Sequence, residues 1–277
     1  MITNSIQLLK KAREQKKCLA AINVYNLESI QAVFEVGRRL DIPIIIAFGE
    51  GYLKHASLDI IVAIVRTLAE NYTNSVVLHL DHCKNLMVIK DAIKVGFTSV
   101  MYDGSNLSYL QNIVNSREVV EYAHPRDVSV EGELGGLNPE DGSDVNNALA
   151  MTDPAQAEEY VSQTDVDSLA VSIGNAHGIY KGVPKLDFDR LELVCQAASV
   201  PIVLHGCSGI PMVDLKKACS IAVAKINVNT EIALAGGLGI ANAINAGSGE
   251  TIKLNILMES AYREMVRAIE PYAALCK

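Results

Sequence analysis

Short runs of β-branched and other apolar residues recur along the chain, and a segment with a helical pattern separates each run from the next. A strand that is covered on both faces has such a continuous apolar run. The eight runs are Cys18–Val24, Ile42–Ala47, Val76–Asp81, Thr98–Asp103, Val128–Glu133, Ser168–Ile173, Ile202–Gly206 and Ala224–Val228. Their starts lie about 22 to 40 residues apart, which is the length of a strand, a loop, a helix and a return loop.

The segments between the runs carry helical signals. Ser29–Leu40 and Leu58–Ala69 each place apolar residues on one side at helical spacing. Asp153 and Pro154 come directly before Ala155–Gln163 and supply an N-cap and a proline at the first helical position. Strands and helices therefore alternate along the chain.

Eight strand–helix units in about 230 residues predict a (β/α)8 TIM barrel of the α/β class. We expect one domain over residues 1–277, with Asn255–Ala274 as a C-terminal helical extension. A doubly wound sheet would usually have fewer strands and a glycine-rich nucleotide loop after the first one, whereas Tyr25–Glu28 follows here. The glycine-rich segment Gly236–Gly239 follows a helical stretch, so we predict that it is a loop.

Composition and charge narrow the class of protein. A chain of 277 residues, 49% of them hydrophobic, can bury a sizeable core and is not disordered. The net charge of −8 gives no overall attraction to nucleic acid or to an anionic membrane, so we expect neither partner. Six scattered cysteines indicate reduced thiols, and the sequence shows neither a signal peptide nor a membrane-length apolar run. We expect a cytoplasmic location.

In such a barrel the chemistry lies at the C-terminal ends of the strands. Three of the six histidines fall at these ends, namely His82, His177 and His205. Three converging neutral imidazoles are the ligands of a catalytic zinc whose fourth position stays open for a carbonyl oxygen. The alternative is that each is an ordinary hydrogen-bonded loop residue, but three at strand ends favour the zinc site.

Asp81 directly precedes His82, so its carboxylate lies beside the expected metal site. It can exchange a proton with a substrate oxygen, or it can support an imidazole by accepting a hydrogen bond. His79 lies inside the same run, and we interpret it as a hydrogen-bonded core histidine.

The ends of the last two runs predict a phosphate site. Gly206–Gly209 and Asn227–Thr230 supply small residues, hydroxyls and free backbone amides ahead of helices. Barrels commonly bind phosphate between these two strands. Gly178 would let a ligand approach equally closely. The alternative for each segment is an ordinary turn glycine.

With these motifs in order, the sequence resembles the class II, zinc-dependent ketose-bisphosphate aldolases, in the fructose- and tagatose-bisphosphate branch. The motifs that carry the resemblance are Leu78–His82, Met101–Ser105, Val130–Gly135, Ala170–Gly178, Leu204–Gly209 and Lys225–Glu231. The resemblance implies His82, His177 and His205 as ligands of Zn²⁺ and Asp81 as the catalytic acid. It also implies Asp103 and Glu133 as ligands of an alternative metal position, and a monovalent cation (Na⁺ or K⁺) near the phosphate. The substrate-binding residues are expected to be Asn23, Gly178, Gly206, Cys207, Ser208, Asn227, Val228, Asn229 and Thr230.

The implied reaction is the reversible aldol cleavage of a ketose 1,6-bisphosphate, of fructose or tagatose type, in carbohydrate metabolism and glycolysis. The products would be dihydroxyacetone phosphate and an aldehyde such as glyceraldehyde 3-phosphate. No Schiff-base lysine is needed, and Lys225 begins its strand rather than ending it. The resemblance also implies a homodimer or homotetramer.

Two segments depart from the family pattern. Glu50 replaces a small hydroxyl residue in a turn that often contacts phosphate, where a carboxylate would repel the ligand unless turned away. In the loop after Gly135, Glu140 is the nearest candidate for the base that deprotonates dihydroxyacetone phosphate. The element that often binds the second phosphate is absent from Gly247–Asn255, so the aldehyde is not assigned.

Three alternatives stay open at this point. The chain could be the related aldolase that cleaves a phosphorylated deoxy-keto acid of inositol catabolism. It could be a metal-dependent barrel enzyme of another class, such as a hydrolase, which would leave the phosphate segments unexplained. It could also be a non-catalytic partner subunit, although such a subunit has no physical need to keep Asp81 and the three histidines.

Overall fold

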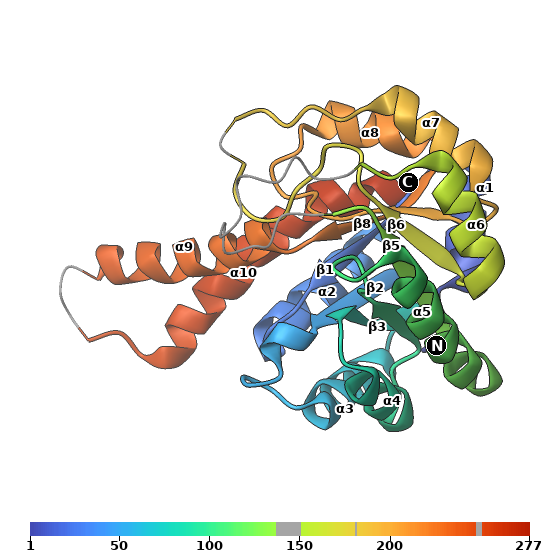
Figure 1. Cartoon of the computed structure of the whole chain (residues 1–277). Coiled ribbons are helices and arrows are strands. Elements are labelled where there is room, and N and C mark those ends of the chain that lie inside the picture. Colours follow the sequence, from blue (N-terminus) through green and yellow to red (C-terminus); the bar gives the residue numbers. More distant parts are fainter. Residues whose placement is uncertain (137–150, 181, 248–250) are drawn as a thin grey trace.

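Eight parallel strands form a closed barrel in the order β1 to β8, with helices around it (Figure 1). The computed structural model describes residues 1–136, 151–180, 182–247 and 251–277. The strands are β1 Leu19–Asn23, β2 Ile44–Gly49, β3 Val76–Cys83, β4 Ser99–Tyr102, β5 Ser129–Leu134, β6 Ser168–Val171, β7 Ile202–Leu204 and β8 Val223–Val228. The predicted (β/α)8 barrel and all eight predicted strands are confirmed.

Helices alternate with the strands, as the apolar spacing predicted. They are α1 Ile6–Glu14, α2 Leu27–Leu40, α3 Leu58–Ala69, α4 Leu86–Val95, α5 Tyr109–Ala123, α6 Pro154–Thr164, α7 Phe188–Ala197, α8 Met212–Ile221, α9 Thr230–Ala246 and α10 Leu254–Ala273. Asp153 caps α6 by accepting hydrogen bonds from the amides of Ala155 and Gln156. Among the described residues, no helix combines the length and the apolar character that a membrane crossing requires.

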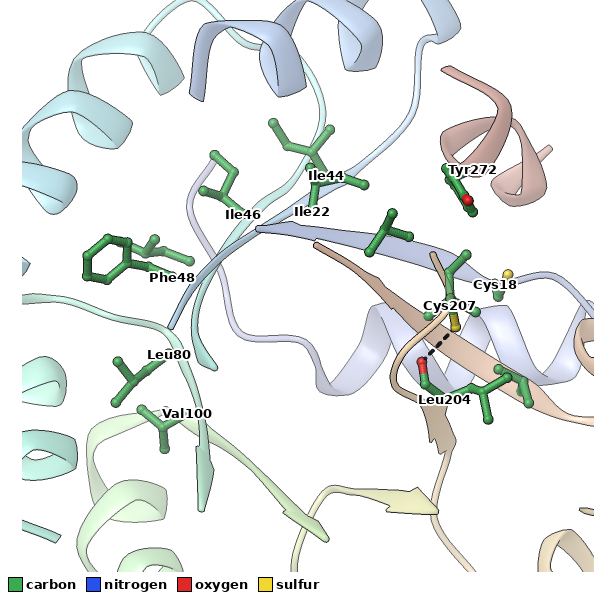
Figure 2. Packing of buried hydrophobic residues seen from close by; sticks show 14 of the residues in the cluster. Cys18, Ile22, Ile44, Ile46, Phe48, Leu80, Val100, Leu204, Cys207 and Tyr272 are labelled. Atoms are coloured by element: carbon green, nitrogen blue, oxygen red, sulfur yellow. Dashed lines mark hydrogen bonds between the residues drawn. The ribbon is translucent and has the colours of Figure 1, made fainter. Parts of the chain in front are cut away.

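The main core lies between the strands and the surrounding helices. Alternate residues of a strand face opposite sides of a sheet, so Ile44, Ile46 and Phe48 of β2 join the outer core while Ile45 and Ala47 face the barrel interior. Figure 2 shows part of the outer core. Further along the strands the buried interior positions become polar, and this change marks the end of the barrel that carries the site.

The prediction of a loop at Gly236–Gly239 is wrong, because this segment lies inside α9. Helix α9 packs along α10, and the pair extends away from the barrel (Figure 1). A Cβ atom on Gly239 would lie 2.5 Å from the carbonyl oxygen of Ser260, and one on Gly236 would lie 3.3 Å from the sulfur of Met265. These glycines therefore allow two helices to approach closely, and they do not mark a turn.

Candidate active site and metal centre

Three histidine rings meet at the C-terminal end of the barrel. The ring centroid of His82 lies 4.6 Å from that of His177 and 4.5 Å from that of His205. Each ring offers a nitrogen, and the three nitrogens lie within 4.8 Å of one another. Among the described residues, His82 Nε2, His177 Nε2 and His205 Nδ1 are buried without a hydrogen-bond partner. Buried polar atoms are rarely left unpaired, so this donor set fits a metal ion that prefers imidazole nitrogen.

An irregularity in β3 brings His82 to the barrel mouth. Consecutive residues of a regular strand face opposite sides, yet Asp81 and His82 line the same cavity. The register between β3 and β4 shifts between Leu80 and Cys83, and His82 has a φ of 45°, in the left-handed region. This conformation costs about 1–2 kcal/mol for a residue with a Cβ. Because of this backbone conformation, the neighbouring side chains of Asp81 and His82 both face the site.

A second group of possible metal ligands shares His82. Its Nδ1 lies 3.4 Å from Asp103 Oδ2 and 3.5 Å from Glu133 Oε2. These three residues also bring one ligand atom each within 4.8 Å of the others. The geometry is compatible with the expected alternative metal position, which remains a proposal.

Burial and neighbouring charges shift the pKa values of these groups in different directions. Burial lowers the pKa of His177 well below its usual value, and the His82 and His205 rings lower it further. Burial opposes protonation of His82, but Asp81, Asp103 and Glu133 together raise its pKa well above the usual value. Burial raises the pKa of Glu133, and the carboxylate of Asp103 adds to this effect. Two neighbouring imidazoles thus differ in their affinity for a proton.

Asp81 is buried and held by two asparagines. Asn23 Nδ2 donates to Oδ2 of Asp81 over 2.8 Å, and Asn227 Nδ2 donates to Oδ1 over 2.9 Å. Burial alone would raise the pKa of Asp81, but the His82, His205 and His79 rings lower it well below its usual value. The side chain is therefore an ionised carboxylate in a fixed orientation.

Most of the expected substrate-binding residues surround one cavity beside the three histidines. Gly206 has a φ of 64°, and a Cβ there would lie 2.1 Å from the carbonyl oxygen of Ala176, so only glycine fits. The expected residues that line the cavity are Asn23, Gly178, Gly206, Ser208, Asn227, Asn229 and Thr230. The side chains of Cys207 and Val228 are fully buried elsewhere, and the thiol of Cys207 donates to the carbonyl of Leu204 over 3.1 Å (Figure 2). Only the backbones of these two residues are available to a ligand.

A larger cavity of about 430 Å³ opens beside the histidines and includes Glu50 in its lining. Glu50 Oε2 accepts a hydrogen bond from the amide of Lys84 over 2.9 Å, so part of its charge is directed at the backbone. Lys84 Nζ lies 3.9 Å from Asp103. Glu140, the expected base, falls within 137–150 and therefore lies outside the described residues.

Sequence reasoning missed two functional candidates, Glu131 and Lys225. Glu131 Oε1 lies 2.8 Å from His205 Nε2, and its Oε2 lies 2.7 Å from Lys225 Nζ. The signal was present, because Glu131 stands two residues before Glu133 and must share its face of the strand. His79 is a hydrogen-bonded core histidine, as predicted, with Nδ1 2.8 Å from Ser99 Oγ.

Comparison with known proteins agrees with this geometry. The family model described as "Fructose-bisphosphate aldolase class-II" matches residues 3–277. The structure is similar to that of the YdjI aldolase from Escherichia coli K12, with a TM-score of 0.88 and 30% identity over 99% of this chain and 97% of that one.

A protein assigned as a fructose-1,6-biphosphate aldolase from Coccidioides immitis gives a TM-score of 0.87 and 29% identity over 99% and 96% of the two chains. The structure is also similar to that of fructose-bisphosphate aldolase from Campylobacter jejuni, with a TM-score of 0.84 and 22% identity over 99% and 96% of the two chains. At this identity the similarity supports the fold alone. The family implies a divalent metal, which the three histidines could hold. The chain belongs to the class II fructose-bisphosphate aldolase family and is a carbon–carbon lyase of the ketose-bisphosphate type.

Proposed function

We propose that the protein catalyses the zinc-dependent, reversible aldol cleavage of a ketose 1,6-bisphosphate of fructose or tagatose type. The products are dihydroxyacetone phosphate and an aldehyde such as glyceraldehyde 3-phosphate. One observation carries the proposal: the ionised Asp81 lines the same cavity as three histidines, each of which has a ring nitrogen without a partner among the described residues. A proton acceptor next to a site for an oxygen-polarising metal is what aldol chemistry requires.

The metal ligands in this proposal are His82 through Nε2, His177 through Nε2 and His205 through Nδ1. Three imidazoles with room for a further ligand are typical of catalytic zinc. Zn²⁺ bound there would act as a Lewis acid on the ketone oxygen of the substrate. Asp103 and Glu133 stay candidates for a second position of the ion, since they share His82 with the first.

Asp81 moves the proton of the reaction. In the cleavage direction its carboxylate accepts the proton of the substrate hydroxyl as the carbon–carbon bond breaks. In the condensation direction the same group returns that proton to the oxygen of the incoming aldehyde. Asn23 and Asn227 hold the carboxylate in one orientation, so the proton acceptor is already positioned when the substrate binds.

The phosphate of dihydroxyacetone phosphate is assigned to the cavity lined by Gly178, Gly206, Ser208, Asn229 and Thr230. Thr230 begins α9, and the amides at a helix N-terminus attract an anion. Cys207 and Val228 would take part through backbone atoms. A Na⁺ or K⁺ ion near these glycines remains a prediction, as does Glu140 as the base.

We also infer that the protein is a homodimer or homotetramer in the cytoplasm. Leu234 and Leu238 lie one helical turn apart on α9 and are 55% and 56% exposed. Adjacent exposed leucines on a projecting helix are typical of an interaction surface. All six cysteines are free thiols, which agrees with a reducing compartment.

The test is the exchange of C–H hydrogen of dihydroxyacetone phosphate with solvent, which does not depend on the identity of the aldehyde. We expect exchange by the wild-type protein, loss on chelation, recovery with added zinc, and no recovery in His177→Ala. The matched control is His124→Ala, since His124 pairs with Asp167 outside the site. A folded, zinc-loaded wild-type protein without exchange would refute the proposal. If exchange is observed, cleavage assays with fructose bisphosphate, tagatose bisphosphate and a deoxy-keto acid phosphate assign the substrate.

A further inference from the structure

A line of polar side chains crosses the barrel interior directly below the histidine site. It runs from Ser99 on β4 through His79 on β3, Lys225 on β8 and Glu131 on β5 to His205 after β7. The successive distances are 2.8, 3.2, 2.7 and 2.8 Å. Every one of these residues is at most 3% exposed. Barrel interiors are usually filled by branched apolar residues, so this buried polar line needs an explanation.

The donor and acceptor capacities of these side chains determine which atom of each pair carries the hydrogen. Lysine has three donors and no acceptor, so His79 Nε2 must accept from Lys225 and His79 Nδ1 must donate to Ser99. An ionised glutamate only accepts, so Glu131 Oε2 accepts from Lys225 and Oε1 accepts from His205. His205 therefore carries its hydrogen on Nε2. In the neutral ring the lone pair then lies on Nδ1, the nitrogen without a partner among the described residues.

Folding stability does not account for a buried ion pair of this kind. Well-packed apolar residues in its place are often neutral or stabilising, because the charges lose their hydration. The pair of Lys225 and Glu131 does have one consequence that apolar residues would not have. It leaves His205 a single hydrogen-bond arrangement, with Nδ1 directed at the nitrogens of His82 and His177.

We propose that Glu131 is a positioning residue that holds His205 in the Nε2–H tautomer and so presents Nδ1 to the metal ion, while Lys225 sets the orientation of the side chain at position 131. The identity of the ion rests on the proposed function, whereas the tautomer does not. Lys225 can only donate, so it must face an oxygen of the side chain at position 131.

This role makes an unusual prediction for Glu131→Gln. The single carbonyl oxygen of glutamine must turn to Lys225, which can only donate, so the amide NH₂ faces His205 Nε2. That nitrogen must then accept, and the hydrogen moves to Nδ1, where it blocks the metal. Removing the donor in Glu131→Gln/Lys225→Met lets the glutamine turn its oxygen back to His205. The second substitution should therefore rescue the first.

The experiment measures the ¹⁵N shifts of histidine rings in the metal-free protein at a pH of about 8, above the usual histidine pKa. Signals of His205 are identified by their loss in His205→Asn. We expect the Nε2–H tautomer in the wild type and in Lys225→Met, the Nδ1–H tautomer in Glu131→Gln, and a return to Nε2–H in the double variant. Zinc affinity, measured by competition with a chromogenic chelator, should fall about 10–100-fold in Glu131→Gln and recover by about 10-fold in the double variant.

The matched control is Asp167→Asn, which weakens a histidine–carboxylate contact of 3.0 Å to His124 away from the site. It should leave zinc affinity and the His205 signals unchanged. A His205 that keeps the Nε2–H tautomer in Glu131→Gln, or a double variant that binds zinc no better than the single one, would overturn the proposal.

If Glu131→Gln does not fold, Glu131→Leu/Lys225→Met replaces it, and there His205 should show both tautomers. A single Nε2–H tautomer in that variant would overturn the proposal. If the wild type binds no zinc, the metal assignment fails, while the tautomer series still decides the positioning role.

Discussion

Asn227 on β8 donates a hydrogen bond over 2.9 Å to the Oδ1 atom of Asp81 on β3, across the mouth of the barrel. Asn23 on β1 binds the other carboxylate oxygen, so neither oxygen of Asp81 can rotate away. Both amide oxygens of these asparagines are buried without a partner among the described residues. The two asparagines thus use their donors on Asp81 and keep their acceptors for another group, such as the hydroxyls of a sugar.

Replacing Asp81 should separate the two halves of the reaction. In Asp81→Asn we expect ketose-bisphosphate cleavage to fall by about 10²–10⁴-fold, the usual contribution of a positioned proton acceptor. Hydrogen exchange from dihydroxyacetone phosphate should persist, because that step does not use the aldehyde oxygen. Parallel assays of cleavage and exchange on the same zinc-loaded preparation give the comparison. Equal losses in both assays would remove Asp81 from its assigned role.

The stability of the metal-free protein should decrease as the pH falls below about 6.5. Burial, with Lys225 adding to it, lowers the pKa of His79 to about 3 in the folded protein. Between about pH 6.5 and 3 the unfolded chain therefore binds a proton that folded His79 does not bind. This linkage removes up to about 1.4 kcal/mol of unfolding free energy per pH unit.

Urea unfolding of the wild type and of His79→Gln at about pH 7, 6 and 5 measures this contribution. From about pH 7 to 5 the free energy of unfolding should decrease more for the wild type than for the variant. Ordinary carboxyl groups have pKa values below this pH range, so they contribute little. Parallel curves for the two proteins would show that His79 does not contribute.

Substitution by alanine should change the free energy of unfolding in opposite directions at two glycines of α9. Gly239→Ala forces a methyl group against the backbone of Ser260 and Ala261 in α10, and we expect a loss of about 1–3 kcal/mol. Gly237 has open space around its Cβ position, so Gly237→Ala should gain about 0.5–1 kcal/mol from helix propensity. The midpoint of urea unfolding reports both changes. Similar shifts for the two variants would contradict the close helix contact.

Charge on the exposed face of α9 should disrupt the proposed assembly. Leu234→Lys/Leu238→Lys would place two cations where we infer a subunit contact, and we expect a monomer by light scattering after size exclusion. Val213→Lys on α8 is the control, because Val213 is also exposed but lies on another helix. An unchanged mass for the α9 variant would refute this surface as the contact.

The sequence was sufficient for the barrel because its strands are fully covered and therefore appear as uninterrupted apolar runs. His82, His177 and His205 were predictable as a group, since strand ends of one barrel meet at one mouth. The backbone of His82 was not predictable, because the left-handed conformation depends on the register of β3 against β4.

The polar contacts inside the barrel also could not be predicted from the sequence. Lys225 looked remote from the site because it stands early in its strand, yet it reaches Glu131 across the barrel interior. Gly236 and Gly239 look like turn residues, and only the position of α10 shows that they serve helix packing. Contacts between different helices and strands determine the roles of Lys225, Gly236 and Gly239.

The closure of the barrel also constrains how the protein is made. Strand β1 pairs with β2 on one side and with β8 on the other, with Leu19 opposite Lys225. The amide of Cys18, just before β1, donates to the carbonyl of Leu275 near the C-terminus. A chain emerging from the ribosome therefore carries β1 with one unpaired edge until β8 has been synthesised. Any product that stops before β8 keeps two open strand edges, which are prone to pair with other chains.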